Sequence, residues 1–279
     1  MSSGTKSLLF YVGIIVLALG LGVISNGWRV EWLDVVGVFH NERSIFWIGQ
    51  QPLKCYGNQV IHVRSRDVTT HEAGFDNDQE GTITAMGHCH VIVEDSKLTA
   101  KQPIVALEQS VVTVKNSEID CKGFGDCIAA EGHARVDLEH ATIRASIDAH
   151  PCKTCDTAKE ESFGNGVSLA GYASLLMNGG LIDANGGTDI DAHDGARIEL
   201  HDATLKTMNV VDKLGDPPTE AYAFELRDSP HVEIFGGVLE GAMCAIWIDT
   251  NATVALHGTK IIGNPCRFPQ PKNVTGLRR

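Results

Sequence analysis

The sequence lacks the signatures of several common enzyme and binding classes. It has no GxSxG nucleophile elbow, no P-loop and no dinucleotide-binding fingerprint, so nothing supports the enzyme classes that depend on them. Basic residues are also few, with 23 Lys and Arg against 35 Asp and Glu and a formal net charge of −12. Because nucleic-acid binding requires Lys and Arg to neutralise phosphates, this balance argues against a nucleic-acid partner.

Helical periodicity is missing from most of the chain. Between residues 55 and 265, no helix-length stretch repeats apolar residues at i, i+3, i+4 and i+7. Short stretches rich in Val, Ile and Thr alternate apolar and polar residues instead, as β-strands do. One eight-residue phrase recurs with a small residue at its sixth position. Its copies are IHVRSRDV (61–68), VIVEDSKL (91–98), VTVKNSEI (112–119), VDLEHATI (136–143), LLMNGGLI (175–182), IELHDATL (198–205), VEIFGGVL (232–239) and VALHGTKI (254–261).

The spacing of these copies predicts a repeat architecture. The underlying period is about 21–24 residues, three units carry insertions, and a second short alternation precedes the phrase from its second copy onward. Each unit therefore supplies several short strands joined by tight turns, as in one coil of a parallel β-helix. A β-sandwich with regular strands is the alternative, but it would not need the same small residue at the same offset. Arg66 breaks the small position only in the first copy.

These units resemble the right-handed parallel β-helix (pectate-lyase-like) superfamily over about residues 55–265. The resemblance is carried by the repeat, because no lyase or galacturonase signature is present. It implies an all-β fold, a single right-handed parallel β-helix of about eight coils. We assign residues 58–264 to this β-helix, residues 29–57 to a cap over its N-terminal end and residues 265–279 to an irregular C-terminal extension.

The N-terminal segment predicts membrane attachment. Residues 8–28 are uncharged and just long enough for a transmembrane signal anchor, after a short cytoplasmic tail at 1–7. A cleaved signal peptide is the alternative, with Val23 and Ser25 at the −3 and −1 positions. Either segment directs the chain to export. We expect a single-pass membrane protein with its N-terminus in the cytoplasm and its β-helix in the periplasm or extracellular space.

The eight cysteines support export, because an even number in an exported chain indicates disulfides. One pair lies at equivalent positions of neighbouring coils, and another brackets a Gly-rich turn. A third pair forms a CxxC motif in a long insertion, where we favour a loop closed by a disulfide over a metal site or redox chemistry. The expected pairs are Cys244–Cys266, Cys121–Cys127, Cys152–Cys155 and Cys55–Cys89.

One outward-facing set of residues could carry chemistry. Aligning the short alternations predicts that three successive coils gather Asp191, His193, Glu225, Arg227, Trp247 and Asp249, with Asp189 on the same face. Earlier coils would present Thr84, Ala106, Ala129 and Ser168 in the same row. Carbohydrate-active members of the superfamily place acidic groups and a cation on such a face. The resemblance therefore implies a catalytic group of Asp191, Glu225, Arg227 and Asp249, with His193 and Trp247 binding substrate.

A solvated ladder of opposite charges is the alternative interpretation of these residues. We favour a non-enzymatic, membrane-anchored module that presents its surface to an envelope glycan or a partner protein. Such a module could also be an accessory subunit of a larger membrane complex. Its partners would be the membrane, through residues 8–28, and that glycan or envelope protein. The second function is a small polysaccharide lyase or glycoside hydrolase. No cofactor is expected. Binding of Ca²⁺ by the carboxylates of Asp191, Glu225 and Asp249 is the alternative.

Overall fold

The computed structural model describes residues 42–44, 52–70, 81–122, 125–146, 164–184, 187–207, 222–241, 244–262 and 274–275. Over this part of the chain all regular structure is β, in 26 strands with no helix. No helix of the described residues is long and apolar enough to cross a membrane. The predicted anchor at residues 8–28 lies outside these residues.

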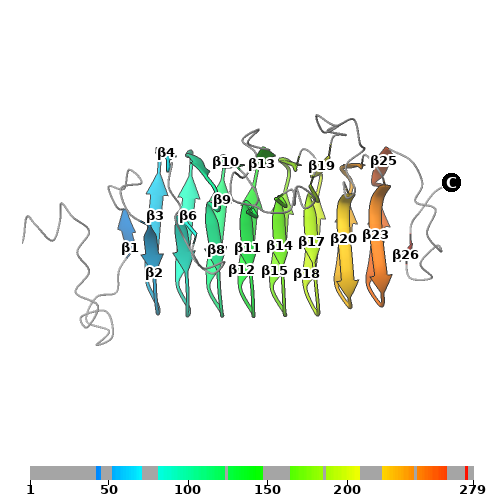
Figure 1. Cartoon of the computed structure of the whole chain (residues 1–279), viewed down its shortest axis with the longest axis horizontal. Coiled ribbons are helices and arrows are strands. Elements are labelled where there is room, and N and C mark those ends of the chain that lie inside the picture. Colours follow the sequence, from blue (N-terminus) through cyan, green and yellow to red (C-terminus); the bar gives the residue numbers. More distant parts are fainter. Residues whose placement is uncertain are drawn as a thin grey trace, which may run out of the picture. The chain divides into compact units, whose positions relative to one another are not determined.

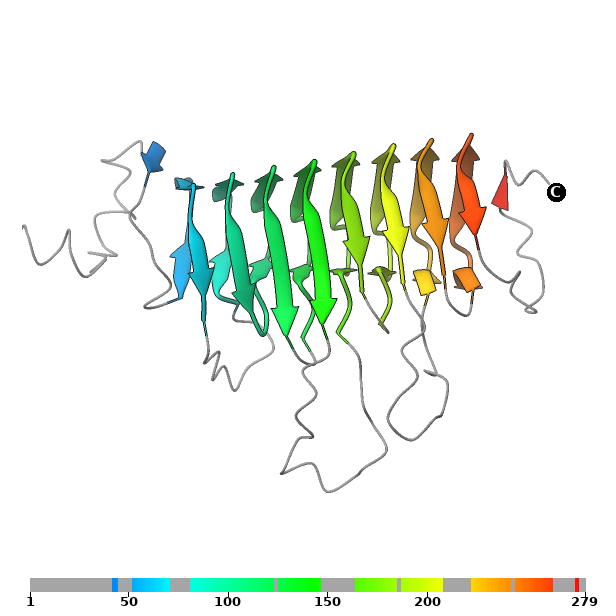
Figure 2. The same ribbon diagram turned by 90° about the horizontal axis from the view of Figure 1, so that it is seen from above.

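The strands form three parallel sheets, to which each of eight coils contributes one strand apiece (Figures 1 and 2). This arrangement is consistent with the predicted parallel β-helix. Sheet 1 contains β2 (Leu53–Cys55), β5 (Ile83–Ala85), β8 (Ile104–Ala106), β11 (Ile128–Ala130), β14 (Val167–Leu169), β17 (Ile190–Ala192), β20 (Tyr222–Asp228) and β23 (Cys244–Thr250). Sheet 2 contains β1 (Glu42–Ser44), β3 (Val60–Arg64), β6 (His90–Glu94), β9 (Val111–Lys115), β12 (Arg135–Glu139), β15 (Ser174–Asn178), β18 (Arg197–His201), β21 (His231–Phe235), β24 (Thr253–His257) and β26 (Val274–Thr275). Sheet 3 contains β4 (Asp67–Thr69), β7 (Lys97–Ala100), β10 (Glu118–Lys122), β13 (Thr142–Ser146), β16 (Leu181–Asp183), β19 (Thr204–Lys206), β22 (Val238–Glu240) and β25 (Lys260–Ile262).

The core consists of apolar side chains that stack on their equivalents in the next coil. Alternation along each sheet 2 strand turns every second residue inward, which produces the buried positions of the repeated phrase. Burial of each such side chain contributes about 1.5–3 kcal/mol. One continuous row runs through Ile61, Val91, Val112, Val136, Leu175, Ile198, Val232 and Val254.

The corner between sheets 2 and 3 explains the small residue of the repeat. Each coil turns there at a residue with positive φ, and from the second coil onward the small residue of the repeat follows it. A Cβ added at Gly180 would collide with the carbonyl oxygen of Ala141, so a larger side chain does not fit in this coil. The residues with positive φ before the small position are Ser65, Asp95, Asn116, His140, Gly179, Asp202, Gly236 and Gly258, and the small residues Gly180 and Gly237 have positive φ as well.

The corner between sheets 1 and 2 has a similar row of positive-φ residues. Most are glycines, and acidic residues replace them in three coils. In two of these the carboxylate reaches the glycine of the preceding coil: Glu108 Oε2 accepts from Gly87 N at 2.9 Å, and Asp194 Oδ2 accepts from Gly171 N at 3.0 Å. These bonds satisfy corner N–H groups and fasten neighbouring coils together.

Two of the expected disulfides are confirmed. Cys55 pairs with Cys89 across the first two coils, with Cα atoms 5.9 Å apart, and Cys121 pairs with Cys127 at 5.0 Å. Cys152, Cys155 and Cys266 lie outside the described residues, and only the backbone of Cys244 is described. The pairs Cys244–Cys266 and Cys152–Cys155 stay predictions.

The two ends of the solenoid add details that the repeat did not contain. Sheet 1 begins at Leu53–Cys55, inside the range 29–57 expected to form the cap, and Glu42–Ser44 pairs with β3. Within the C-terminal range 265–279, Val274–Thr275 pairs with β24. The strands Glu42–Ser44 and Val274–Thr275 do not carry the eight-residue phrase. Each adds a strand at one end of sheet 2.

Candidate functional site

The outer face of sheet 1 gathers the predicted residues on three adjacent strands. Asp191 on β17 lies opposite Glu225 on β20, which in turn lies opposite Trp247 on β23. The parallel, in-register pairing follows from the stacking of Ile190, Phe224 and Ile246 one position earlier. The alignment of the sequence therefore places these three side chains in one row, as expected.

Most charged groups on this face pair with one another. His193 Nε2 lies 3.0 Å from Asp191 Oδ2, and Arg227 Nε donates to Glu225 Oε1 at 2.8 Å, with Arg227 Nη2 contacting the same oxygen. Thr188 Oγ1 donates to the other oxygen, Glu225 Oε2, at 3.4 Å. Glu225 is buried, with 6% of its surface exposed, whereas the Arg227 side chain is 43% exposed. Glu225 thus fixes the position of the guanidinium.

Asp191 differs from Glu225 because half of its carboxylate has no partner. Its Oδ1 atom is buried and makes no hydrogen bond within the described residues, while Oδ2 faces His193. Its side chain is 13% exposed.

Asp126 belongs to the same face and was not predicted. This partly buried carboxyl accepts a hydrogen bond from Asn165 N at 3.2 Å, two coils from Asp191. Burial raises the pKa of Asp126, and the negative charge of Asp191 raises it further, although hydrogen bonds from Asn165 and Ser168 partly oppose this. The sequence could have indicated Asp126 through the repeat, because it lies two residues before Ile128, as Thr188 and Tyr222 lie two residues before Ile190 and Phe224.

An aromatic pair closes the C-terminal side of the face. The rings of Tyr222 and Trp247 lie 6.2 Å apart with an interplanar angle of 28°. Tyr222 is buried and Trp247 is partly exposed, so the buried phenol ring packs against the indole. Aromatic pairs at this separation add about 0.5–1.5 kcal/mol beyond burial. Sequence reasoning identified Trp247 but not its partner.

Two further acidic residues, Asp249 and Asp189, were also predicted to lie on this face. Asp249 lies opposite Arg227 in the backbone register, and only its backbone is described. Asp189 is not on this face, which corrects the expectation. It is fully buried, its Oδ1 accepts from Ala184 N at 2.8 Å, and burial raises its pKa well above the usual value. The chain turns a corner just before β17, so alternation does not extend back to residue 189.

The earlier coils correct the predicted row in one place. Thr84, Ala129 and Ser168 occupy it, but Val105 takes the position expected for Ala106. Ala106 points into the core with Ala85 and Ala130. Thr84, Val105, Ala129 and Ser168 are small or apolar, and Lys54 on β2 continues the row at its N-terminal end. The acidic groups described above lie on the coils from β11 to β20.

Within the described ranges, no group of three or more His, Cys, Asp or Glu residues has an arrangement that could hold a metal ion. Most of the two longest insertions, around residues 146–165 and 206–220, lies outside those ranges. The chain matches no protein family, no curated protein and no solved structure with significance.

Proposed function

We propose that this chain is a membrane-anchored, extracytoplasmic β-helix module that binds an envelope glycan on the outer face of sheet 1. The observation that carries the proposal is the partly exposed Trp247, which lies beside Tyr222 and directly next to Glu225. An aromatic ring flanked by fixed polar groups suits a sugar, which has an apolar ring face and hydroxyls at its edge. We also propose that the β-helix is right-handed and that the chain is a member of the pectate-lyase-like superfamily.

The pairing of charges favours binding over catalysis. Glu225 is engaged by Arg227 and Thr188, and His193 by Asp191. Groups held in this way present defined donors and acceptors to a ligand, with little loss of side-chain entropy on binding. A general acid or base must lie within hydrogen-bond reach of the proton that it transfers, whereas both oxygens of Glu225 already accept hydrogen bonds. The face is therefore better suited to hold a glycan than to cleave one.

The disulfides support an extracytoplasmic location. Cys55–Cys89 and Cys121–Cys127 persist only where the surroundings are oxidising, as in the periplasm or outside the cell. With the uncharged segment 8–28 as anchor, the N-terminus would lie in the cytoplasm. The β-helix would then face the envelope or extracellular glycans.

The proposal is tested by glycan binding to the full-length chain in lipid nanodiscs, because sugar-based detergents would compete. We expect Trp247→Ala to weaken binding of its preferred glycan about fivefold to tenfold. Tyr172→Ala is the matched control, because Tyr172 is 67% exposed and lies on a corner away from this face. Equal losses in the two variants, or binding only to a protein partner, would overturn the proposal.

A second candidate, a polysaccharide lyase or glycoside hydrolase, is favoured by the carboxyl of Asp126. Its raised pKa keeps it protonated to higher pH than an ordinary aspartate, and Asp191 lies nearby as the partner carboxylate. An acid and a base in one site are what glycosidic hydrolysis requires. Turnover of polysaccharides, followed by reducing ends and by ultraviolet absorbance of unsaturated products, should be lost in Asp126→Asn and Asp191→Asn. No turnover by the wild type would exclude this candidate.

A further inference from the structure

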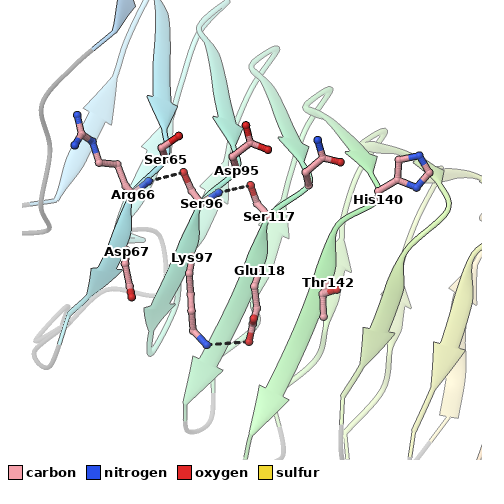
Figure 3. Close-up of a pocket in the computed structure, with 11 residues that line it drawn as sticks. Ser65, Arg66, Asp67, Asp95, Ser96, Lys97, Ser117, Glu118, His140 and Thr142 are labelled. Atoms are coloured by element: carbon pink, nitrogen blue, oxygen red, sulfur yellow. Dashed lines mark hydrogen bonds and ion pairs between the residues drawn. The ribbon is translucent and has the colours of Figure 1, made fainter.

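A groove of about 800 Å³ lies on a different surface, at the corner between sheets 2 and 3 (Figure 3). It crosses the first four coils and runs along the direction in which the coils stack. Its lining is entirely polar or charged and contains no apolar residue. The lining residues are Ser65, Arg66, Asp67, Asp95, Ser96, Lys97, Asn116, Ser117, Glu118, His140 and Thr142.

One wall of the groove is a row of four exposed polar side chains. Ser65, Asp95, Asn116 and His140 are the positive-φ residues of four successive coils, and all four are exposed. Their side chains make no hydrogen bond or ion pair with any described residue. Equivalent positions in neighbouring coils repeat every 4.7–4.9 Å. The wall thus offers a hydroxyl, a carboxylate, an amide and an imidazole in line, one per coil.

The floor and the opposite wall are already organised. The hydroxyls of Ser96 and Ser117 bond to backbone groups of the corner, at 2.7 Å to Glu94 O and at 2.6 Å to Lys115 O. On the far side, Lys97 Nζ pairs with Glu118 Oε1 at 3.0 Å. The wall of positive-φ residues therefore supplies hydrogen-bonding capacity for a ligand, together with the lining side chains of Asp67 and Thr142.

The charge of the lining selects the class of ligand. Two basic residues, Arg66 and Lys97, nearly balance the acidic residues Asp67, Asp95 and Glu118. Neither a strongly anionic nor a strongly cationic ligand gains much from such a surface. Short polar side chains that both donate and accept hydrogen bonds match the hydroxyl groups of an uncharged, polyhydroxylated molecule. Their regular spacing along the groove suits a linear polymer with a short repeat.

We propose that this corner groove binds an uncharged linear oligosaccharide lengthwise, with successive sugars contacting the side chains of Asp95, Asn116 and His140 in successive coils. The site is separate from the sheet 1 face and does not depend on the function proposed for that face. It would give the module a second point of contact along a polysaccharide. Two linked contacts on one polymer raise the overall affinity through effective concentration.

The test uses the full-length chain in lipid nanodiscs and three uncharged hexasaccharides: β-1,4-linked glucose, α-1,4-linked glucose and β-1,4-linked N-acetylglucosamine. The double variant Asp95→Gly/Asn116→Gly removes two wall side chains at φ values of 48° and 45°, a conformation that glycine adopts without strain. Asp202→Gly is the matched control, at the same corner position with φ 49° but outside the groove. Trp247→Ala, alone and combined with the double variant, isolates the groove from the sheet 1 face.

We expect at least one hexasaccharide to bind Trp247→Ala, and the added double variant to weaken that binding about tenfold, as the loss of two hydrogen bonds predicts. Asp202→Gly should leave affinity within about twofold. Binding that Trp247→Ala abolishes would overturn the groove proposal and leave the sheet 1 proposal standing. Absence of binding by any hexasaccharide to the wild type would also overturn it, as would equal effects of the double variant and Asp202→Gly.

Discussion

The side-chain hydroxyl of Ser117 accepts a hydrogen bond from the backbone N–H of Ser96, one coil earlier, at 3.0 Å. Ser96 repeats the arrangement, because its own hydroxyl accepts from Arg66 N at 3.1 Å. Both hydroxyls also donate within their own turns, to Lys115 O and Glu94 O. The small residue of the repeat is thus both a steric requirement and, where it is serine, a link between coils.

Removal of this link should destabilise the fold. Ser117→Ala leaves the buried N–H of Ser96 without an acceptor, which costs about 1–3 kcal/mol of unfolding free energy. Ser110→Ala is the matched control, because Ser110 is also fully buried but its hydroxyl has no partner among the described residues. Urea denaturation should show the loss for Ser117→Ala and no loss for Ser110→Ala, because a buried hydroxyl without a partner is itself unfavourable. Equal losses would contradict the role of the hydroxyl.

Two glycines at this corner separate close packing from backbone strain. Gly237 has φ 74°, and a Cβ there would collide with Ala203 O; Gly258 has φ 75° and nothing within 4 Å of an added Cβ. Gly258→Ala should therefore cost only the positive-φ penalty, about 1 kcal/mol. Gly237→Ala should cost several times more, because the backbone of a neighbouring coil must move. Thermal unfolding midpoints of the two variants give the comparison, and similar values would show that backbone conformation alone selects glycine.

The repeated phrase predicted the fold because each of its positions has a separate physical task. Alternating apolar residues such as Val91 and Val93 fill the core, and the small residue turns the corner, so the phrase encodes strand, turn and strand in order. The coil at β8 was misaligned by one residue for an identifiable reason. Ile104, Val105 and Ala106 are all buried, so alternation could not show which of them faces outward.

The candidate site was predictable only where strands are regular. The two-residue periodicity of β-strands placed Asp191, Glu225 and Trp247 in one row, because all three lie within strands. Asp126 and Asp189 precede their strands at a corner, where the period of two ends, so one was missed and the other was put on the wrong face. Whether the grouped side chains bind or catalyse depends on hydrogen-bond geometry that a pattern of residue types does not contain.

The buried carboxyl of Asp189 should make stability depend on pH. Its pKa in the folded state lies well above that of the unfolded chain, about 3.9, so the folded protein holds a proton that the unfolded chain releases. Its favourable contribution is complete below about pH 4 and declines as pH rises toward the folded pKa. Asp189→Asn removes this titration and keeps an acceptor for Ala184 N. The variant should therefore gain stability relative to the wild type as the pH rises from 4 to 8.

Urea unfolding of both proteins at several pH values measures this difference, with Asp202→Asn as an exposed control. The gain should be absent from the control, because Asp202 is solvated in both states. A difference between Asp189→Asn and the wild type that does not change with pH would show that Asp189 is ionised in the fold.

The two confirmed disulfides should contribute unequally to stability, because they close loops of different length. Cys55 and Cys89 are separated by 34 residues, and Cys121 and Cys127 by 6. Loop-closure entropy of the unfolded chain then gives about 4 kcal/mol for the first and about 2 kcal/mol for the second. Cys55→Ser/Cys89→Ser should accordingly lower the unfolding free energy about twice as much as Cys121→Ser/Cys127→Ser. Each cysteine in these pairs is fully buried, so the two double variants carry a similar cost of replacing sulfur with hydroxyl. If the shorter loop proves the more important, the Cys121–Cys127 link must act on the folded corner before β11, next to Asp126, rather than on the unfolded chain.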